Sequence, residues 1–330
     1  MTLRNLDANY KSFFALWKNG DKKARPPRFK GKDFFTTLCY NQSGFDVKNH
    51  TISLSHKHPS KTELIFDISP YPLKDEAKKI KQIGVFTKKG MWFASIIYEI
   101  QEPKYIDNGK YQAIDLGVSN IISAVNLDGK FIQIKNRRAD LYWKKKLQEV
   151  QSKRDHCKKY SRRWKKYHLK FCRMKSKCAN QLKDFQHKIS KQIVKNTKAN
   201  TIIVGDLNVK TMAKKKRTTA SPRQNKAHKT LNHSIQNTGL LGRFVQFLTY
   251  KAQKLGKRVI RIDDSYTTQT CAKCGVRVKR DLSEREITCD CGHQMDRNLN
   301  SAVNIMVKFL ISDHLSHQPS LKEESFLHKW

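Results

Sequence analysis

The sequence predicts an α/β protein, and three observations predict it. Two short apolar runs, Tyr111–Ile114 and Thr201–Val204, are typical of buried strands, and an acid follows each within two residues. A long and very basic stretch over residues 137–198 indicates helices. Four cysteines with the spacing of metal ligands lie within residues 271–291. We therefore expect a sheet, a helical insertion and a metal-held module.

The charge of the chain predicts a polyanionic partner. There are 67 Lys and Arg residues against 28 Asp and Glu, which gives a formal net charge of +39 over 330 residues. Such a surface repels itself unless a polyanion neutralises it, and nucleic-acid phosphates are the natural counter-charge. An anionic membrane fits less well, because the basic residues are spread along the chain. A merely well-solvated surface is the plainer alternative.

Location and redox state follow from composition. No stretch approaches the apolar length of a membrane span, and the first residues lack the apolar region of a signal peptide. We therefore expect a cytoplasmic, nucleoid-associated protein with no membrane partner. Disulfides are rare in a reducing compartment, so the cysteines outside the C-terminal cluster are expected to be free thiols. These are Cys39, Cys157, Cys172 and Cys178.

The first hundred residues predict a short helix, a basic loop and a β-rich module. Leu6–Trp17 has helical character, and the Pro- and Gly-broken loop after it carries Arg28 and Lys30 as expected nucleic-acid contacts. Residues 34–108 are strand-rich and include a hairpin with Gly90 at its turn. We expect a small β-barrel or sheet. An unspecialised sheet explains it as well as a nucleic-acid platform does.

The order of elements beyond residue 109 is that of an RNase H-like core. A strand ends in Asp115, then come a hairpin, the helical stretch, a strand before Asp206, a helix, a strand and a last helix. The expected bounds are Ile121–Asn126 and Phe131–Ile134 for the hairpin strands, Leu240–Leu255 for the helix with Leu255 on its apolar face, Lys257–Ile262 for the strand, and Arg297 for the start of the last helix. Lys210–Asn232 predicts a loop, and the tail from Ser312 is expected to be weakly ordered.

The helical stretch is too long for one ordinary helix, which favours a helical hairpin. Between Leu141 and Ser190 it carries 17 Lys and Arg residues against three acids. So many unbalanced charges favour a face that tracks phosphates over a merely solvated surface. The expected contacts are Lys158, Lys159, Arg162, Arg163, Lys165 and Lys166, joined by Arg297 further along the chain.

Acids at the ends of distant elements predict a metal site of the phosphodiester-cutting kind. Asp115, Asp206 and Asp296 could meet at one edge of the sheet, where carboxylates hold two Mg²⁺ ions about 4 Å apart in such sites. The plainer alternative makes Asp115 and Asp206 turn residues and Asp296 a helix N-cap. The order of elements favours the fold without proving a working site.

The cysteine spacing predicts a closed, structural Zn²⁺ site. Cys271, Cys274, Cys289 and Cys291 form two thiolate pairs, each followed by a glycine that permits a tight turn. The second pair is one residue shorter than usual, so His293 is a candidate substitute ligand. Unliganded cysteines are the alternative. A ribbon this small buries little core, so the metal should hold it together.

Several of these motifs resemble the TnpB family, and the likeness extends to about residue 310. They are Ala113-Ile114-Asp115-Leu116-Gly117, Val204-Gly205-Asp206-Leu207-Asn208-Val209-Lys210, the Tyr266–Gly275 segment YTTQTCAKCG, Asp296-Arg297-Asn298-Leu299-Asn300-Ser301-Ala302, and near the start Leu6-Asp7-Ala8, Phe13-Phe14 and Pro27-Arg28-Phe29-Lys30. The resemblance implies a RuvC-like nuclease core, a β-barrel wedge module, a guide RNA and a DNA target read by base pairing.

Three departures from the family pattern matter. The family's Glu before Asp-Leu-Asn is Gly205 here, and its second Asp after the ribbon is Asn298, so only Asp115 keeps its acid. Asp206 and Asp296 are poor substitutes, because positions one apart on a strand or two apart on a helix face differently. Asp263 and Asp264, after a later strand, stay open as compensating ligands. The family's first barrel strand and recognition helices are also missing from the start.

The resemblance therefore implies a nuclease-inactive, guide RNA-directed DNA-binding protein of the TnpB-like repressor type, without Mg²⁺. The alternatives are an active Mg²⁺-dependent guided endonuclease, a decayed transposon copy, and a zinc-ribbon DNA-binding protein without RNA. The expected domains are 1–33 (helix and basic loop), 34–108 (wedge-like module), 109–264 (RuvC-like core with insertion 137–198), 265–293 (zinc ribbon), 294–311 (last core helix) and 312–330 (tail).

Overall fold

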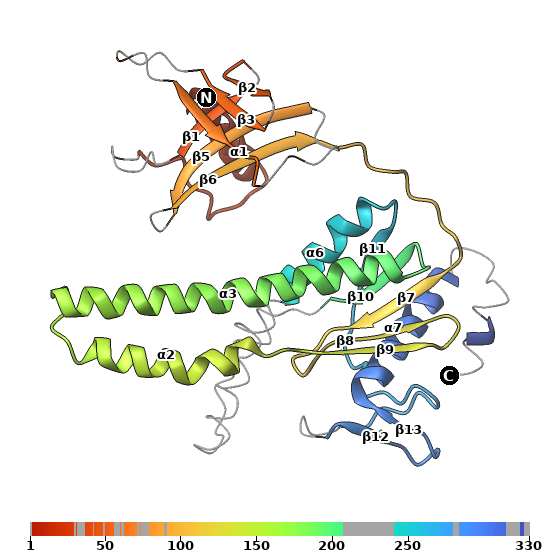
Figure 1. The fold of residues 1–330 in the computed structure, drawn as a ribbon. Helices are drawn as coiled ribbons and strands as arrows, with labels where there is room; N and C mark the ends of the chain where they lie inside the picture. Colours follow the sequence, from red (N-terminus) through yellow and green to blue (C-terminus); the bar gives the residue numbers. More distant parts are fainter. Residues whose placement is uncertain are drawn as a thin grey trace. The chain divides into compact units, whose positions relative to one another are not determined.

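The computed structural model divides the chain into two compact units, Met1–Gln101 and Glu102–Trp330 (Figure 1). It describes residues 2–29, 31, 37–41, 43–48, 50–55, 60, 63–70, 73, 79–88, 91–206, 241–279, 284–314 and 324–326. The predicted loop Lys210–Asn232, the turn at Gly90, Leu240 and Lys30 lie outside these residues. Among the described helices, none is long and apolar enough to span a membrane.

Within its described residues, the first unit holds one helix and two small antiparallel sheets. Helix α1 spans Thr2–Lys18, so it begins earlier than predicted. One sheet has the order β1-β5-β6 and the other β2-β3-β4. Their core is built from alternate strand residues, with Ile52, Leu54, Ile83 and Val85 buried. The strands are β1 (Thr37–Asn41), β2 (Phe45–Lys48), β3 (Thr51–Leu54), β4 (Leu64–Asp67), β5 (Lys79–Lys88) and β6 (Met91–Glu99). The predicted hairpin is confirmed by the antiparallel pairing of β5 with β6.

A five-stranded sheet of order β11-β10-β7-β8-β9 organises the second unit. Strands β11, β10 and β7 are parallel, whereas β7, β8 and β9 form the predicted antiparallel meander. The strands span Tyr111–Asp115 (β7), Asn120–Asn126 (β8), Phe131–Lys135 (β9), Thr201–Gly205 (β10) and Arg258–Ile262 (β11). All five residues of β7 and of β10 are buried, as the continuous apolar runs predicted.

Helices cover both faces of this sheet. Along β10, Ile202 and Val204 pack in one core with Phe244 of α6 (Leu241–Gln253), while Ile203 packs in the other with α7 (Arg297–His314). Helix α6 ends before Leu255, which is 54% exposed, so the prediction that Leu255 lies on the apolar face is wrong. The chain leaves the helix at Gly256, whose φ of +66° favours glycine.

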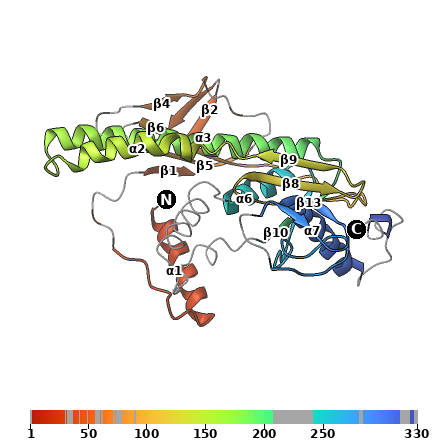
Figure 2. The same cartoon turned by 90° about the horizontal axis from the view of Figure 1, so that it is seen from below.

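The predicted helical hairpin is confirmed. Helices α2 (Ala139–Asp155) and α3 (Arg162–Asn196) run side by side, and their connected ends project beyond the sheet (Figures 1 and 2). Ser161 caps α3 by accepting a hydrogen bond from the Trp164 amide at 3.2 Å. At the other end of α3, Lys257 Nζ donates to the carbonyls of Val194 and Thr197 at 3.0 and 2.6 Å. These bonds fasten the base of the hairpin to the sheet.

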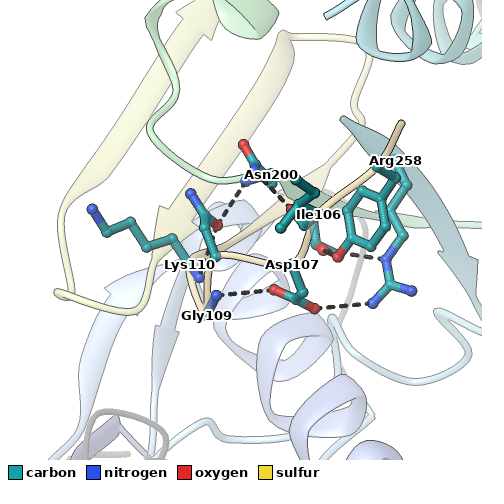
Figure 3. A network of polar contacts seen from close by, with 9 residues as sticks. Ile106, Asp107, Gly109, Lys110, Asn200 and Arg258 are labelled. Carbon is teal, nitrogen blue, oxygen red and sulfur yellow. Dashed lines mark hydrogen bonds and ion pairs between the residues drawn. The ribbon is translucent and has the colours of Figure 1, made fainter. Parts of the chain in front are cut away.

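Polar contacts hold the segment that enters the second unit (Figure 3). The residues concerned are Tyr105, Ile106 and Asp107, and we call them the polar strap. Arg258 lies over the Tyr105 ring, at 4.5 Å from its centroid, and pairs with Asp107 at 3.3 Å. Asn200 Nδ2 donates to the Ile106 carbonyl at 2.8 Å, and Tyr105 hydrogen-bonds to Thr201 through their hydroxyls at 2.7 Å. The strap therefore holds the starts of β10 and β11.

The C-terminal part consists of a two-stranded ribbon, a helix and a short described piece of the tail. The ribbon pairs β12 (Glu286–Thr288) with β13 (Gln294–Asp296). Helix α7 continues to His314, and Phe326 is buried in the core beside it. The prediction that the tail from Ser312 is weakly ordered is wrong at these two points, because an apolar ring in a polar tail can still dock on the core.

Candidate functional site

The carboxyl ends of β7 and β10 meet at one edge of the sheet, because the two strands are parallel neighbours. Asp115 ends β7 with only 7% of its surface exposed. It accepts a hydrogen bond of 3.1 Å from the hydroxyl of Ser301 on α7. That hydroxyl is in turn 2.8 Å from Thr267 Oγ1. Asp115, Ser301 and Thr267 therefore form a buried polar cluster, and this cluster with the residues around it is called the Asp115 pocket below.

The pocket disfavours an ionised carboxylate. Burial, with smaller contributions from the nearby charges of Asp264 and Asp296, raises the pKa of Asp115 to about 7. The Ser301 hydrogen bond and the charge of Arg297 act in the opposite direction without cancelling the burial. Arg297 is itself half-buried, and burial lowers its pKa. The surroundings of Asp115 therefore favour its neutral form more than water does.

Gly205 ends β10, and another acid occupies the space that a side chain there would fill. A Cβ atom added to Gly205 would lie 2.8 Å from Cβ and 3.1 Å from Oδ2 of Asp264. Asp264 is half-buried, and its burial, together with Asp263 and Asp206, raises its pKa. Asp263 instead faces outward, and hydrogen bonds from Ser265 lower its pKa. Of the two compensating candidates, Asp264 alone lies against Gly205.

The other two predicted acids are engaged elsewhere. Asp206 is exposed and lies 3.9 Å from Arg261 NH1, while its amide still donates to the Ile262 carbonyl. Asp296 Oδ1 accepts from the amides of Asn298 and Leu299 at 3.0 and 3.1 Å, so Asp296 caps α7. The N-cap alternative considered for Asp296 is therefore correct.

Asn298 lies beside the turn that follows Asp115. A Cβ atom added to Gly117 would be 3.5 Å from Asn298 Nδ2. The position that carries an acid in the resembled family thus holds a neutral amide at the rim of the pocket. The structure brings Asp115, Gly205 and Asn298 to the same edge of the sheet, with Asp264 added to them.

The four cysteines form the one His/Cys/Asp/Glu cluster of metal-binding geometry within the described residues. Their Sγ atoms all lie within 4.8 Å of one another, with Cys271 and Cys291 at 3.8 Å and Cys274 and Cys289 at 3.5 Å. His293 is not part of this cluster. The glycines after Cys274 and Cys291 have φ of +74° and +80°, which the tight turns require. The donor set of four thiols fits a closed, tetrahedral metal site.

Two asparagines on α7 that sequence reasoning missed fasten the cysteine ribbon to the pocket. Asn300 Oδ1 accepts from the Ala272 amide at 2.9 Å, and its Nδ2 donates to the Thr270 carbonyl at 2.7 Å. Asn304 Nδ2 donates to the carbonyls of Thr267 and Thr270 at 2.8 Å each. The available signal was the pair of asparagines four residues apart, which places both on one face of the helix.

The predicted nucleic-acid contacts fall in three places. Arg28 is exposed in the first unit, and Lys30 lies outside the described residues. Arg297 faces the acids of the pocket rather than open solvent. The remaining six predicted contacts are exposed at the connected end of the α2–α3 hairpin: Lys158, Lys159, Arg162, Arg163, Lys165 and Lys166.

Comparison with known proteins locates relatives of both halves of the second unit. A family model described as "Probable transposase" (OrfB_IS605) matches residues 95–234, and one described as "Cas12f1-like, TNB domain" matches residues 242–305. The Escherichia coli (strain K12) protein named "Putative RNA-guided DNA endonuclease InsQ" is 29% identical over 92% of this chain and 72% of its own length.

A viral relative and a solved structure add to this. "TnpB-like protein L79" of Acanthamoeba polyphaga mimivirus is 34% identical over 45% of this chain and 25% of its own length. A Cas12f1 chain, solved in complex with sgRNA and target DNA, shares the fold with a TM-score of 0.54 at 13% identity, covering 92% of this chain and 69% of that one. Together the matches confirm that the chain resembles the TnpB family over most of its length.

Proposed function

We propose that the protein is a nuclease-inactive, RNA-guided DNA-binding protein that represses transcription at guide-matched DNA. The observation that carries this is the composition of the pocket at the ends of β7 and β10. Gly205 and Asn298 stand where the family has acids, so Asp115 is the one acid kept at a matched position, and the charge of Arg297 acts on it. A pair of Mg²⁺ ions needs more negative charge than this pocket offers.

The proposal assigns the other parts of an RNA-guided protein to the remaining elements of the chain. In this proposal the mixed sheet with helices on both faces is an RNase H-like, RuvC-like core spanning 109–264 and 294–311. The two sheets of the first unit serve as the wedge-like module, 34–108. The four-cysteine cluster of 265–293 holds a structural Zn²⁺, which its thiol donor set supports. The InsQ name and the Cas12f1 complex support a guide RNA and a DNA target as partners.

The basic hairpin is proposed to grip phosphates of the bound nucleic acid. The end where α2 and α3 are connected carries six exposed Lys and Arg residues. This end projects beyond the sheet, and there the two helices lie side by side (Figure 1). Phosphate contacts give affinity that falls steeply with salt. Neutralising these six residues should therefore flatten the dependence of affinity on salt concentration, whichever sequence is bound.

A second candidate function is favoured by one specific contact. Because Asp264 occupies the space beside Gly205, its carboxylate could replace the missing family acid and leave an active, Mg²⁺-dependent endonuclease. Asn298 would still leave that site one acid short. This alternative requires Asp264 to be essential for cutting, whereas the repressor does not.

The test is to purify the protein with its bound RNA, sequence that RNA, and present the matched DNA with and without Mg²⁺. The proposal expects retention of the duplex without cutting, and repression of a reporter that carries the matched site upstream. Mg²⁺-dependent cleavage that is lost in Asp264→Ala and kept in Asp263→Ala would establish the endonuclease instead. Absence of a discrete RNA would point to a decayed copy or to a zinc-ribbon protein that binds DNA alone.

A further inference from the structure

Tyr266, four residues beyond β11, has an unusual backbone and an exposed ring. Its φ is +67°, a conformation that bulky residues rarely adopt, yet 52% of its surface is exposed. The surrounding loop enforces this geometry. The Tyr266 carbonyl accepts hydrogen bonds from the amides of Gln269 and Thr270 at 2.8 and 3.0 Å, and from the Thr270 hydroxyl at 3.1 Å. The backbone at Tyr266 is therefore fixed, while the residue stays exposed.

Arg277 stacks on this ring. Its guanidinium carbon lies 3.2 Å from the ring centroid, and its Nε donates to Gln269 Oε1 at 3.3 Å. A bridge between Thr270 and Arg277 and a bond from the Val278 amide to the Gln269 carbonyl fix the backbone beneath the pair. The bond to Gln269 uses one of the five N–H donors of the guanidinium, and the others can serve a ligand. The two planar groups form an ordered, solvent-facing surface.

The pair is directly connected to the Asp115 pocket. Thr267, the residue after Tyr266, contacts Ser301, whose hydroxyl donates to Asp115. Asp264, which lies against Gly205, is two residues before Tyr266. A nucleotide held on the Tyr266–Arg277 surface would therefore lie on the chain segment that borders the pocket.

We propose that Tyr266 and Arg277 form a stacking platform for one unpaired nucleotide of DNA beside the Asp115 pocket. A planar aromatic ring backed by a guanidinium stacks on bases of any sequence, and the guanidinium donors suit a phosphate. Charge supports this occupant on the Arg277 side, where residues 271–279 carry Lys273, Arg277 and Lys279 and no acid, while Asp263 and Asp264 lie on the side of Tyr266 toward the pocket. Bases of intact duplex are already stacked on each other, so the platform requires an unpaired strand. The inference rests on the proposed function in one respect: pairing of guide with target supplies that strand.

The test uses the purified protein and a single-stranded DNA oligonucleotide that carries 2-aminopurine, whose fluorescence falls when it stacks. We expect binding to quench the probe. Tyr266→Asn, which keeps a residue tolerant of positive φ, should abolish the quenching and weaken binding by about 5- to 100-fold, the range for loss of one stacked base. Tyr266→Phe should keep both. Arg277→Lys, which keeps the charge but not the plane, should weaken binding and the quenching.

Unchanged quenching and affinity in Tyr266→Asn would overturn the proposal. It would also be overturned if Tyr266→Asn lost more affinity for the same sequence made as RNA than for the DNA oligonucleotide. If Tyr266→Asn fails to retain its metal, the affinity of Arg277→Lys for the oligonucleotide is the deciding measurement. An affinity equal to that of the wild-type protein would overturn the proposal. Retention of guide-matched duplex is measured in parallel. Loss of single-strand stacking with duplex retention unchanged isolates the platform, whereas a wild-type protein that lacks RNA or cuts the duplex refutes the proposed function alone.

Discussion

Replacing Asp115 by Asn should make the protein more stable at high pH. Asp115 is buried at the end of β7, and its folded-state pKa of about 7 lies above its ordinary value of 3.8. The folded protein therefore holds this proton more tightly than the unfolded chain does. Stability is highest where the group is protonated in both states, and it falls as the pH rises from about 4 through about 7.

The size of the effect follows from the two pKa values. A carboxyl whose pKa rises by roughly three units on folding opposes folding by about 4 kcal/mol once it is fully ionised. Between pH 5 and pH 8.5 this one group should lower the free energy of unfolding by about 2–3 kcal/mol. Asp115→Asn keeps the size of the side chain and an oxygen for the Ser301 hydrogen bond, yet it removes the titration.

Urea unfolding followed by circular dichroism at pH 5 and pH 8.5 measures the difference between variant and wild type. We expect the advantage of Asp115→Asn to grow by about 2–3 kcal/mol between the two pH values. Asp206→Asn, at an exposed acid near the same edge, is the matched control and should show no such growth. Both comparisons are repeated in 10 mM Mg²⁺.

Two results would refute the reasoning. An advantage that is the same at both pH values would mean that Asp115 is already ionised in the folded protein. A wild-type protein whose stability at pH 8.5 is restored by Mg²⁺ would mean that a cation occupies the pocket, because a ligand that binds only the folded state stabilises it. The second result would also favour the endonuclease over the repressor.

Three further predictions concern the metal cluster, the strand edge and the helical hairpin. Cys274→Ser should lower the bound zinc measured by mass spectrometry and speed amide exchange over the ribbon, and unchanged protection would contradict a structural metal. Gly205→Ala should lower the free energy of unfolding by about 1–3 kcal/mol, because its Cβ would lie 2.8 Å from the Cβ of Asp264. In a double-mutant cycle, the same substitution should cost much less when Asp264 is replaced by Gly. Strictly additive effects would disprove the contact. Lys257→Met should lower stability by about 1–2 kcal/mol by removing the donor to two carbonyls at the end of α3, with exposed Lys188→Met, expected to be neutral, as its control in the same urea assay.

The order of elements in the second unit could be predicted because its signals are local. Continuous apolar runs marked β7 and β10, which are buried on both faces, and alternation marked the smaller strands. The spacing of the cysteines likewise predicted correctly that the four thiols gather at one place. The end of α6 was misplaced, since Leu255 matches the helical period although the helix has already ended at Gln253.

The composition of the pocket depended on contacts that sequence spacing does not contain. Residues 205 and 264 meet because β10 and β11 are parallel with Gly205 opposite Ile262, a register that no local pattern specifies. For the same reason, sequence reasoning could offer Asp263 and Asp264 together without choosing between them. Ser301 was missed because a serine in a helix carries no sign of the distant strand end it contacts.

The strap around Tyr105 and Asp107 shortens the free chain between the two units. Pro103 and Lys104 already touch the space beside Gly256, so only about three residues after β6 remain without such a hold. The segment that enters the second unit is consequently anchored at the first residues of β10 and β11, and these two strands end, five residues on, at the edge of the sheet that holds Asp115.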